Sequence, residues 1–301
     1  MPTLTILNPA AGRGRAREVW EMLRARTGEP DSQLHVTTAP GEAEDVARAA
    51  LLAGTERIFV VGGDGTFNEV LNGFFVNGAA LNPAAVLVAV AAGTGCDLVR
   101  TLAGMPAPGG FIAMDVGKVT CVGADGGERV RYFANVASCG QSARVAAAVK
   151  RMPRWCGGPA AYLLAILESL ATYQPVAVSL SIDGVAGDPR RVRCVALANG
   201  RAFGGGLTIA PDARVDSGAL DLAVIGAAPR RWLLRNLGAI YRGDHAGMPH
   251  ISHAQAQQID IRSAEPVAIE ADGEVIGSLP ARVELLAGAV RVALPGHVFV
   301  G

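Results

Sequence analysis

The sequence predicts an α/β protein in which an N-terminal α/β nucleotide-binding domain with a parallel sheet precedes a C-terminal β-sandwich domain. Up to about residue 114, apolar runs alternate with helical segments, and three strands end in glycine turns. Beyond that point, short strands separated by Asp-Gly turns dominate. The chain has 301 residues, which is long for one domain and comfortable for two.

The N-terminal elements follow from hydrophobic periodicity. Val19, Trp20 and Leu23 give the first helix an apolar stripe, whereas the strands are short apolar runs bounded by turns. The expected elements are strands at 4–7, 35–37, 58–61 and 84–91, a turn at 8–14, and helices at 15–26, 41–53, 67–72 and 98–102. In such a sheet, ligands bind at the carboxyl ends of the strands, where the glycine turns lie.

The C-terminal part has shorter elements with a period of two. Its expected strands are 114–122, 129–136, 176–182, 192–198, 219–225, 258–261, 267–271, 281–286 and 289–294, and its helices are 159–172 and 229–241. His250 and His253 lie three residues apart in a polar, loop-like stretch and show no metal-ligand spacing. We therefore place an α/β domain at 1–117 and a β-rich domain at 118–286.

Composition excludes several classes of protein. Lys and Arg total 27, as do Asp and Glu, so no net field favours nucleic acid. No apolar run approaches the roughly 18 residues of a membrane span. The beginning of the sequence lacks a signal-peptide pattern. The five cysteines are scattered without paired spacing, which indicates reduced thiols and a cytoplasmic location.

The stretch Gly62-Gly63-Asp64-Gly65-Thr66 follows the apolar run 58–61 and precedes a helical segment that Thr66 is placed to cap. A strand, glycine turn and helix start form an anion site, because free N–H groups and the positive helix end face a phosphate. Glycines permit close approach of the ligand. Asp64 is explained by a bridging cation or an oriented nucleophile. The alternative is a plain strand-to-helix turn with an incidental Asp.

Five motifs occur in order: Asn8-Pro9-x-x-Gly12, Gly62 to Thr66, Gly93-Thr94-Gly95-x-Asp97, Asp115-x-Gly117 and Asp272-Gly273-Glu274. Together they resemble the diacylglycerol kinase catalytic family, which includes sphingosine and ceramide kinases and bacterial lipid kinases. The resemblance covers nearly the whole chain. It implies an ATP-dependent lipid kinase, a transferase of phospholipid biosynthesis, in which residues 287–301 return to the ATP-binding domain. Residues 118–286 would then form the lipid-substrate domain.

The resemblance also implies roles for individual residues. Glu274 would be the general base, because a lipid hydroxyl must lose its proton as it attacks the γ-phosphate. Asp64 and Asp97 would be catalytic and, with Asp115, would hold Mg²⁺. The positions expected to bind ATP are Asn8, Gly12, Thr37, Gly62, Gly63, Asp64, Gly65, Thr66, Asn68, Gly93, Thr94 and Gly95. For Asp272-Gly273, an ordinary hairpin turn is the alternative.

Two positions depart from the family pattern. Cys96 stands where relatives usually have Asn, so a thiol replaces a hydrogen-bonding amide. In the loop 211–220, which resembles a structural Mg²⁺ loop, Ser217 replaces the acidic residue before Gly218, and Asp216 lies one residue early. A hydroxyl is a poorer Mg²⁺ ligand than a carboxylate. Arg214 and Ala219 would contribute only carbonyls to this second site.

Lipid recognition is harder to locate from the sequence. Basic and aromatic residues at 150–155 and 230–235 suit an anionic membrane surface, which predicts peripheral membrane association. Two core helices with solvated basic ends are the alternative. A NAD-kinase-like phosphotransferase and a non-catalytic nucleotide-binding regulator also stay open, and so does a homodimer. The acceptor lipid, diacylglycerol-like or sphingoid, is not readable from these residues.

Overall fold

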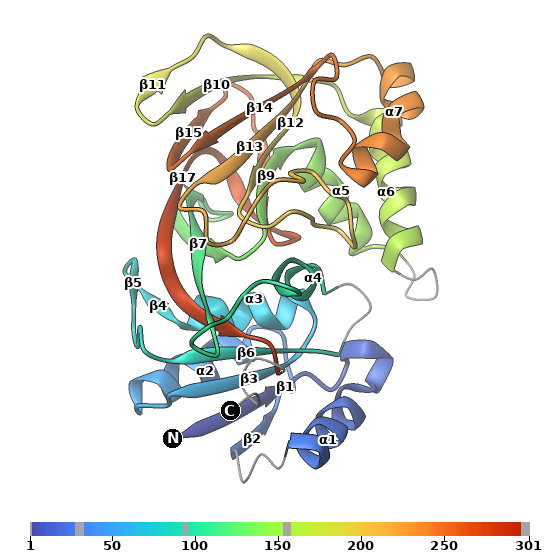
Figure 1. Ribbon diagram of the computed structural model, residues 1–301. Helices are drawn as coiled ribbons and strands as arrows, with labels where there is room; N and C mark the ends of the chain where they lie inside the picture. Colours follow the sequence, from blue (N-terminus) through green and yellow to red (C-terminus); the bar gives the residue numbers. More distant parts are fainter. Residues whose placement is uncertain (1, 28–32, 93–95, 153–157, 296–301) are drawn as a thin grey trace. The chain divides into compact units, whose positions relative to one another are not determined.

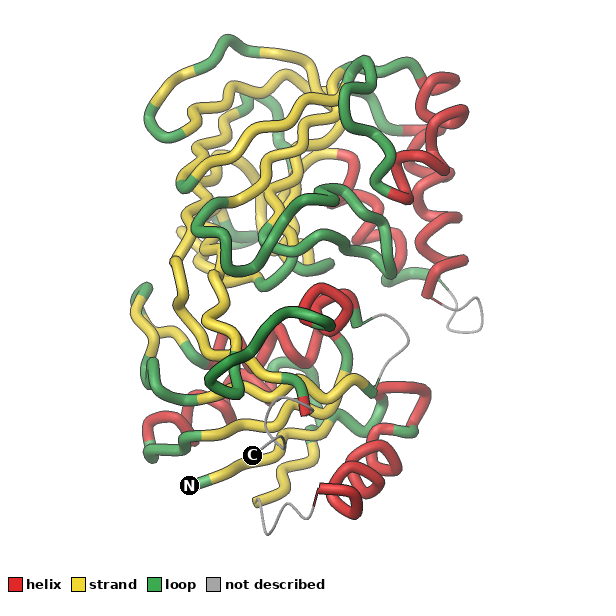
Figure 2. The backbone as a smooth tube through the Cα atoms, viewed as in Figure 1, coloured by secondary structure: helices red, strands yellow, loops and turns green. Residues whose placement is uncertain are grey.

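The computed structural model describes residues 2–27, 33–92, 96–152 and 158–295. The chain is a mixed α/β protein that divides into two compact units (Figures 1 and 2). Unit 1 comprises Met1–Val116 and Ala287–Gly301, and unit 2 comprises Gly117–Leu286. Two strands, β7 (Ile112–Val122) and β17 (Glu274–Ala293), cross the boundary, so each contributes residues to both units.

Unit 1 is built on a sheet in which β2, β1, β3, β6 and the end of β17 are neighbours, and all four pairings are parallel. Its strands are β1 (Thr3–Leu7), β2 (Gln33–Val36), β3 (Arg57–Gly62), β4 (Phe75–Val76), β5 (Ala79–Ala80) and β6 (Val86–Ala91). Its helices are the 3-10 turn η1 (Ala11–Gly14), α1 (Ala16–Thr27), α2 (Glu42–Leu52), α3 (Asp64–Gly73) and α4 (Asp97–Leu102).

A parallel sheet is covered on both faces, so its strands carry apolar side chains on both sides, and the apolar run in β3 fits this pattern. Trp20 of α1 packs on Phe59 of β3 with ring centroids 5.2 Å apart. Strand side chains alternate between faces, so Ile58 and Val60 point away from α1 and are also buried. The sheet therefore fixes where β3 ends, and with it the turn at Gly62.

Unit 2 is mainly antiparallel. Its strands are β8 (Glu128–Phe133), β9 (Val136–Gly140), β10 (Val176–Ile182), β11 (Val185–Ala186), β12 (Arg190–Ala198), β13 (Leu220–Gly226), β14 (Ile251–Ala256), β15 (Gln258–Arg262) and β16 (Ala268–Ala271). Its helices are α5 (Gln141–Val149), α6 (Gly158–Thr172) and α7 (Arg230–Arg242). One face of β9, β12 and β13 packs on the three helices, and the other packs on strands including β10, β15 and β17.

Three expectations about elements were wrong. The polar stretch with His250 and His253 is not a loop throughout: residues 251–256 form β14, an edge strand paired with β13, whose polar side chains face solvent. The strand expected at 129–136 divides into β8 and β9 because Asp272 captures the N–H groups of residues 134–136. The strands expected at 281–286 and 289–294 are both part of β17.

Candidate active site

A pocket of about 360 Å³ lies in unit 1 at the carboxyl ends of β1 and β3. Its volume is in the range of ordinary ligand sites. It is lined by Asn8, Ala10, Ala11, Gly12, Arg13, Gly63, Gly65, Thr66 and Glu69. Five of the residues expected to bind ATP are therefore brought together: Asn8, Gly12, Gly63, Gly65 and Thr66.

The glycines of the turn differ in the space around them. A Cβ on Gly62 would lie 2.6 Å from the Thr66 side chain, so packing demands glycine there. A Cβ on Gly63 or Gly65 would meet no protein atom within 4 Å, because both residues line the pocket. Helix α3 begins at Asp64 with Gly63 as its N-cap and with no side-chain cap. The first turn of a helix has N–H groups without helical partners, so this end suits an anion.

Thr66 does not cap the helix, contrary to expectation. It lies inside the first turn, and its hydroxyl accepts a hydrogen bond from the Asn8 amide at 3.0 Å. The Asn8 side-chain oxygen accepts the N–H of Ala10 at 3.0 Å, which folds the turn after β1. Asn8 therefore ties the two loops of the pocket together.

Gly12 is required by close packing. Its φ is +61°, and a Cβ would lie 1.8 Å from the Ala92 carbonyl oxygen. The next residue, Arg13, is an exposed cation that lines the pocket. The sequence interpretation overlooked both Arg13 and Glu69 as lining residues. Arg13 could have been found, because it is an arginine directly after the glycine of a turn at the end of a strand.

Other expected nucleotide residues do not line this pocket. The Thr37 N–H donates to the Leu7 carbonyl at 2.9 Å, at the end of β1. Asn68 is buried on α3, where its carbonyl and its side-chain oxygen both accept from Asn72. Gly93, Thr94 and Gly95 lie outside the described residues. Cys96 is buried, and its sulfur lies 3.8 Å from the Gly62 carbonyl oxygen.

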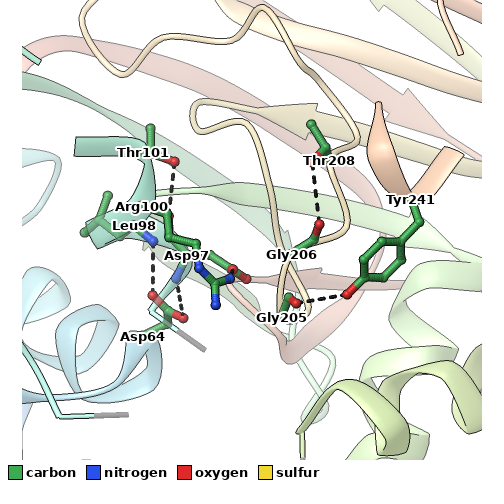
Figure 3. Close-up of polar contacts among 9 residues, drawn as sticks. All are labelled: Asp64, Asp97, Leu98, Arg100, Thr101, Gly205, Gly206, Thr208 and Tyr241. Atoms are coloured by element: carbon green, nitrogen blue, oxygen red, sulfur yellow. Dashed lines mark hydrogen bonds and ion pairs between the residues drawn. The ribbon is translucent and has the colours of Figure 1, made fainter. Parts of the chain in front are cut away.

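Asp64 lies against the first turn of α4, as Figure 3 shows. Its Oδ2 accepts the N–H of Asp97 at 3.0 Å, and its Oδ1 accepts the N–H of Leu98 at 3.2 Å. The buried Asp97 carboxylate accepts from Arg100 at 2.7 Å. The two expected metal ligands are thus adjacent, and each already has a protein partner.

Asp115, the third carboxylate expected to hold Mg²⁺, is buried on β7. Its Oδ1 accepts the N–H of Gly288 at 2.7 Å. Gly288 has a φ of +55° within β17, so this bond fixes the strand at an irregular point. Asp115 therefore helps to hold β17 against β7 within unit 1.

Glu274 is the first residue of β17 and follows a two-residue hairpin turn. Asp272 and Gly273 have φ values of +45° and +84°, and Ala271 is opposite Glu274. Two positive φ values match the type I′ turn that tight hairpins prefer. The Glu274 side chain is 46% exposed, and its Oε1 lies 3.5 Å from Lys150 Nζ. The ordinary hairpin and the catalytic role are therefore compatible.

The turn is anchored by two further carboxyl groups. Asp272 accepts the N–H groups of Ala134, Asn135 and Val136 at 2.8, 2.9 and 3.1 Å. Glu270, which is 1% exposed, accepts the N–H of Gly273 at 2.8 Å. Burial raises the pKa of Glu270 to about 8. The sequence interpretation overlooked Glu270, and a glutamate flanked by apolar residues in the strand before Asp272 was the available signal.

The loop expected to hold a second Mg²⁺ contains several hydrogen bonds among its own residues. Arg214 forms two hydrogen bonds of 3.0 Å with the two carboxylate oxygens of Asp216. The Ser217 hydroxyl donates to the Ala219 carbonyl at 2.9 Å. Among the described residues, no three His, Cys, Asp or Glu side chains gather in a way that could hold a metal ion. Asp216 is the one carboxylate among the four positions expected at this site, Arg214, Asp216, Ser217 and Ala219, and the second Mg²⁺ site stays a prediction.

Unit 2 also contains an apolar cavity of about 90 Å³ between its helices and the sheet. Ile166 and Leu170 of α6 and Leu233 of α7 contribute to its wall. Close to it, the loop Gly204–Gly206 was overlooked in the sequence: a Cβ on Gly204 would lie 2.2 Å from the Tyr162 ring. Tyr241 donates its hydroxyl to the Gly205 carbonyl at 3.0 Å (Figure 3).

Two known protein families have domains that match this chain. Residues 2–120 match the diacylglycerol kinase catalytic domain, and residues 135–294 match the YegS C-terminal NAD kinase beta sandwich-like domain. The chain belongs to the diacylglycerol kinase family. The resemblance inferred from the five motifs is thereby confirmed, and the chain is a kinase with a β-sandwich-like C-terminal domain.

Individual relatives agree with this assignment. Diacylglycerol kinase of Bacillus subtilis is 28% identical to this chain over 302 residues, and the match covers 96% of this chain and 95% of that protein. A protein of Pseudomonas aeruginosa named "Probable lipid kinase YegS-like" is 28% identical over 265 residues, covering 87% and 84% of the two chains. A crystal structure of a diacylglycerol kinase from Bacillus anthracis has a TM-score of 0.66 at 23% identity, covering 96% and 95%, and shares the fold.

Proposed function

We propose that this kinase transfers the γ-phosphate of ATP to the hydroxyl of a lipid. The single observation that carries the proposal is the pocket at the uncapped N-terminus of α3, lined by Gly63, Gly65, Asn8 and Arg13. The N–H groups and the Arg13 guanidinium suit the phosphates of a nucleotide. The family supports a kinase, and the names of its relatives support a lipid acceptor.

Phosphoryl transfer relies mainly on positioning and neutralisation of charge. Mg²⁺ would supply part of the neutralisation. It is usually held by one or two carboxylates plus substrate phosphates. Asp64 and Asp97 fit that donor set, because they are two carboxylates that lie next to each other at the first turns of α3 and α4. We assign no step to the loop at Arg214–Ala219.

Glu274 is our proposed general base. Its carboxylate is half exposed at the end of a rigid turn, with Lys150 as its ion-pair partner. A base must reach the proton that it removes, and a fixed turn limits the directions in which the side chain leaves the backbone. Glu274 would accept the proton of the lipid hydroxyl as that oxygen attacks the phosphorus.

We further propose that hydrocarbon of the acceptor enters the apolar cavity of unit 2. The cavity of about 90 Å³ is smaller than the roughly 300–1,000 Å³ of drug-sized ligand sites, so α6 or α7 must move outward to admit a chain. Ile166→Trp would fill the cavity and should raise KM for a long-chain acceptor. The same substitution should leave ATP affinity unchanged, since unit 1 holds the nucleotide.

Peripheral membrane binding is also proposed. Leu163, Leu164 and Leu167 of α6 are 45%, 49% and 40% exposed, and α7 carries Arg230, Arg231 and Arg235. Exposed leucines and arginines together suit an anionic lipid surface. The basic-aromatic residues Arg154 and Trp155 lie outside the described residues. No helix among the described residues is long and apolar enough to cross a membrane. Co-sedimentation with anionic and neutral vesicles, comparing the parent with Leu163→Glu/Leu167→Glu, tests this surface.

The decisive experiment follows labelled phosphate from ATP into a panel of lipids by thin-layer chromatography. The panel contains diacylglycerol, phosphatidylglycerol, a sphingoid base and ceramide. NAD is included because the C-terminal residues match a NAD kinase beta sandwich-like domain. Label in one lipid supports the proposal, label in NAD replaces it, and ATP binding without transfer indicates a regulator. Light scattering on the same sample tests the homodimer.

A further inference from the structure

Glu270 is a buried carboxyl group that the proposed mechanism does not use. It lies on β16 opposite Ser138 of β9, and it is 1% exposed. One of its oxygens is in a short hydrogen bond with the Ser138 hydroxyl. The other accepts the N–H of Gly273 at 2.8 Å. The group is therefore fully engaged with its surroundings on two neighbouring strands.

The Gly273 contact joins Glu270 to the turn that carries Glu274. Asp272 holds the first residue of this turn by accepting three N–H groups from residues 134–136. Asp272 N–H in turn donates to the Val136 carbonyl at 2.9 Å. Glu270 holds the second residue of the turn, directly before Glu274. The two carboxyl groups thus fix consecutive residues of the turn.

We propose that Glu270 is a positioning residue for Glu274, which it orients by fixing the Gly273 N–H of the shared turn. This inference rests on the proposed function, in which Glu274 takes the proton of the acceptor hydroxyl. Losing the acceptor would leave a backbone N–H without its partner and let the turn pivot. Small errors in the placement of a catalytic group reduce the rate strongly.

Burial is the largest cause of the raised pKa of Glu270, whereas its hydrogen bonds with Ser138 and Gly273 lower that pKa. On its own hairpin, Asp272 is a second carboxylate and disfavours another negative charge. Cys139 of β9 and Cys194 of β12 interact with it, and burial raises the pKa of both thiols, so neither is charged. No Lys or Arg in the described part of the chain forms an ion pair with Glu270. Burial itself raises the pKa of Glu270 to about 8.

The neutral carboxyl can be imitated by an amide. In Glu270→Gln, the amide oxygen can accept the Gly273 N–H, and the amide nitrogen can donate to Ser138. Glu270→Ala removes both contacts. Ionisation of the parent carboxyl keeps both contacts, because a carboxylate accepts from the Gly273 N–H and from the Ser138 hydroxyl, and the glutamine variant does not ionise. The positioning role therefore predicts that the glutamine variant keeps the placement of Glu274 and that the alanine variant loses it.

The test uses the 301-residue chain with Mg-ATP and short-chain diacylglycerol in detergent micelles. We expect Glu270→Ala to lower kcat at least tenfold with unchanged KM for ATP, and Glu270→Gln to restore most of kcat at pH 7. Glu284→Gln, which removes the charge of a half-buried partner of Lys118, is the matched control and should behave as the parent throughout. A parent-like kcat in Glu270→Ala, or a kcat in Glu270→Gln as low as that of Glu270→Ala, overturns the proposal.

Hydrogen exchange of the Gly273 amide provides a readout that does not depend on activity. We expect faster exchange in Glu270→Ala and parent-like exchange in Glu270→Gln. Equal protection in all variants overturns the positioning role. If Glu270→Ala does not fold, Ser138→Ala replaces it, because it keeps the carboxyl and removes one contact; exchange at Gly273 must then also rise. A parent that phosphorylates no lipid rejects the proposed function, whereas the exchange measurement still decides the role of Glu270 in the turn.

Discussion

The Asp64 carboxylate accepts the backbone N–H of Asp97 at 3.0 Å. This contact joins the turn after β3 to the start of α4, 33 positions further along the chain. Asp64 therefore lies in the first turn of α3 and also serves as an acceptor for the first turn of α4. A metal ion bound here would share the carboxylate with a helix end, so substitutions at Asp64 affect local structure as well as charge.

Replacing Gly63 by Val should abolish ATP binding and leave the fold intact. The φ of Gly63 is −106°, which a branched residue tolerates, and a Cβ there would meet no protein atom within 4 Å, so the valine side chain would take up space in the pocket. Calorimetric titration with Mg-ATP measures the loss, and circular dichroism checks the fold. As a contrast, Gly62→Val should lower the melting temperature, because a side chain there collides with Thr66. ATP affinity equal to that of the parent in folded Gly63→Val would reject the assignment of the pocket.

Asp64→Asn should lose most activity. The amide keeps one acceptor for α4 but removes the negative charge that would help to hold Mg²⁺. Raising Mg²⁺ or supplying Mn²⁺ should recover part of the rate if the metal role is correct. Turnover is measured against metal concentration alongside the melting temperature. A lowered melting temperature without metal rescue would instead assign the defect to the lost contact with α4.

Glu274→Gln should reduce lipid phosphorylation by about 10²–10⁴-fold, the range for a positioned general base. The amide preserves shape but cannot take a proton, so ATP affinity should barely change. Both quantities are measured on the same sample. Lys150→Ala is the matched control, since exposed ion pairs contribute little and its effect should stay within a few-fold. A loss below about tenfold in Glu274→Gln would count against the base assignment.

Glu270→Gln should stabilise the protein increasingly as the pH rises. In the unfolded chain the carboxyl ionises near its ordinary pKa of 4.5, whereas in the folded protein it stays protonated up to about pH 8. Between these two pKa values the free energy of unfolding of the parent falls by at most about 1.4 kcal/mol for each unit of pH, because the unfolded chain releases the proton that the folded protein keeps. The glutamine side chain does not ionise, so the variant does not lose this stability. Denaturant unfolding at pH 4, 6 and 8 measures the difference, which should grow across the series and then level off. An unchanged difference would contradict the raised pKa.

The loop at Arg214–Ala219 should not respond to Mg²⁺ in the parent, because Arg214 already neutralises Asp216. Ser217→Asp restores a carboxylate at the position before Gly218. In the absence of nucleotide, thermal unfolding of this variant should shift upwards with millimolar Mg²⁺, relative to the parent. The same upward shift in the parent would show that the loop binds Mg²⁺ without the carboxylate.

Local patterns predicted much of the fold. The apolar runs predicted β1, β3 and β6 because such runs can be buried only inside a covered sheet, and the Asp-Gly pairs at 183–184 and 272–273 became tight turns. Patterns failed where long-range contacts decide. The four central residues of β14 are exposed, so the strand has only a weak apolar pattern, and it forms by pairing with β13.

The sequence by itself determined the family and the kinase class, because these depend on five short motifs in order, and each motif is made of residues that are neighbours in the chain. The tertiary structure decided what each carboxylate contacts. Asp64 reaches α4, Asp115 fixes Gly288, and Asp272 holds residues 134–136. Glu270 acquires its raised pKa only through burial beside Ser138 and Asp272. Hydrogen-bond partners and desolvation depend on residues far apart in the chain, and no local pattern contains them.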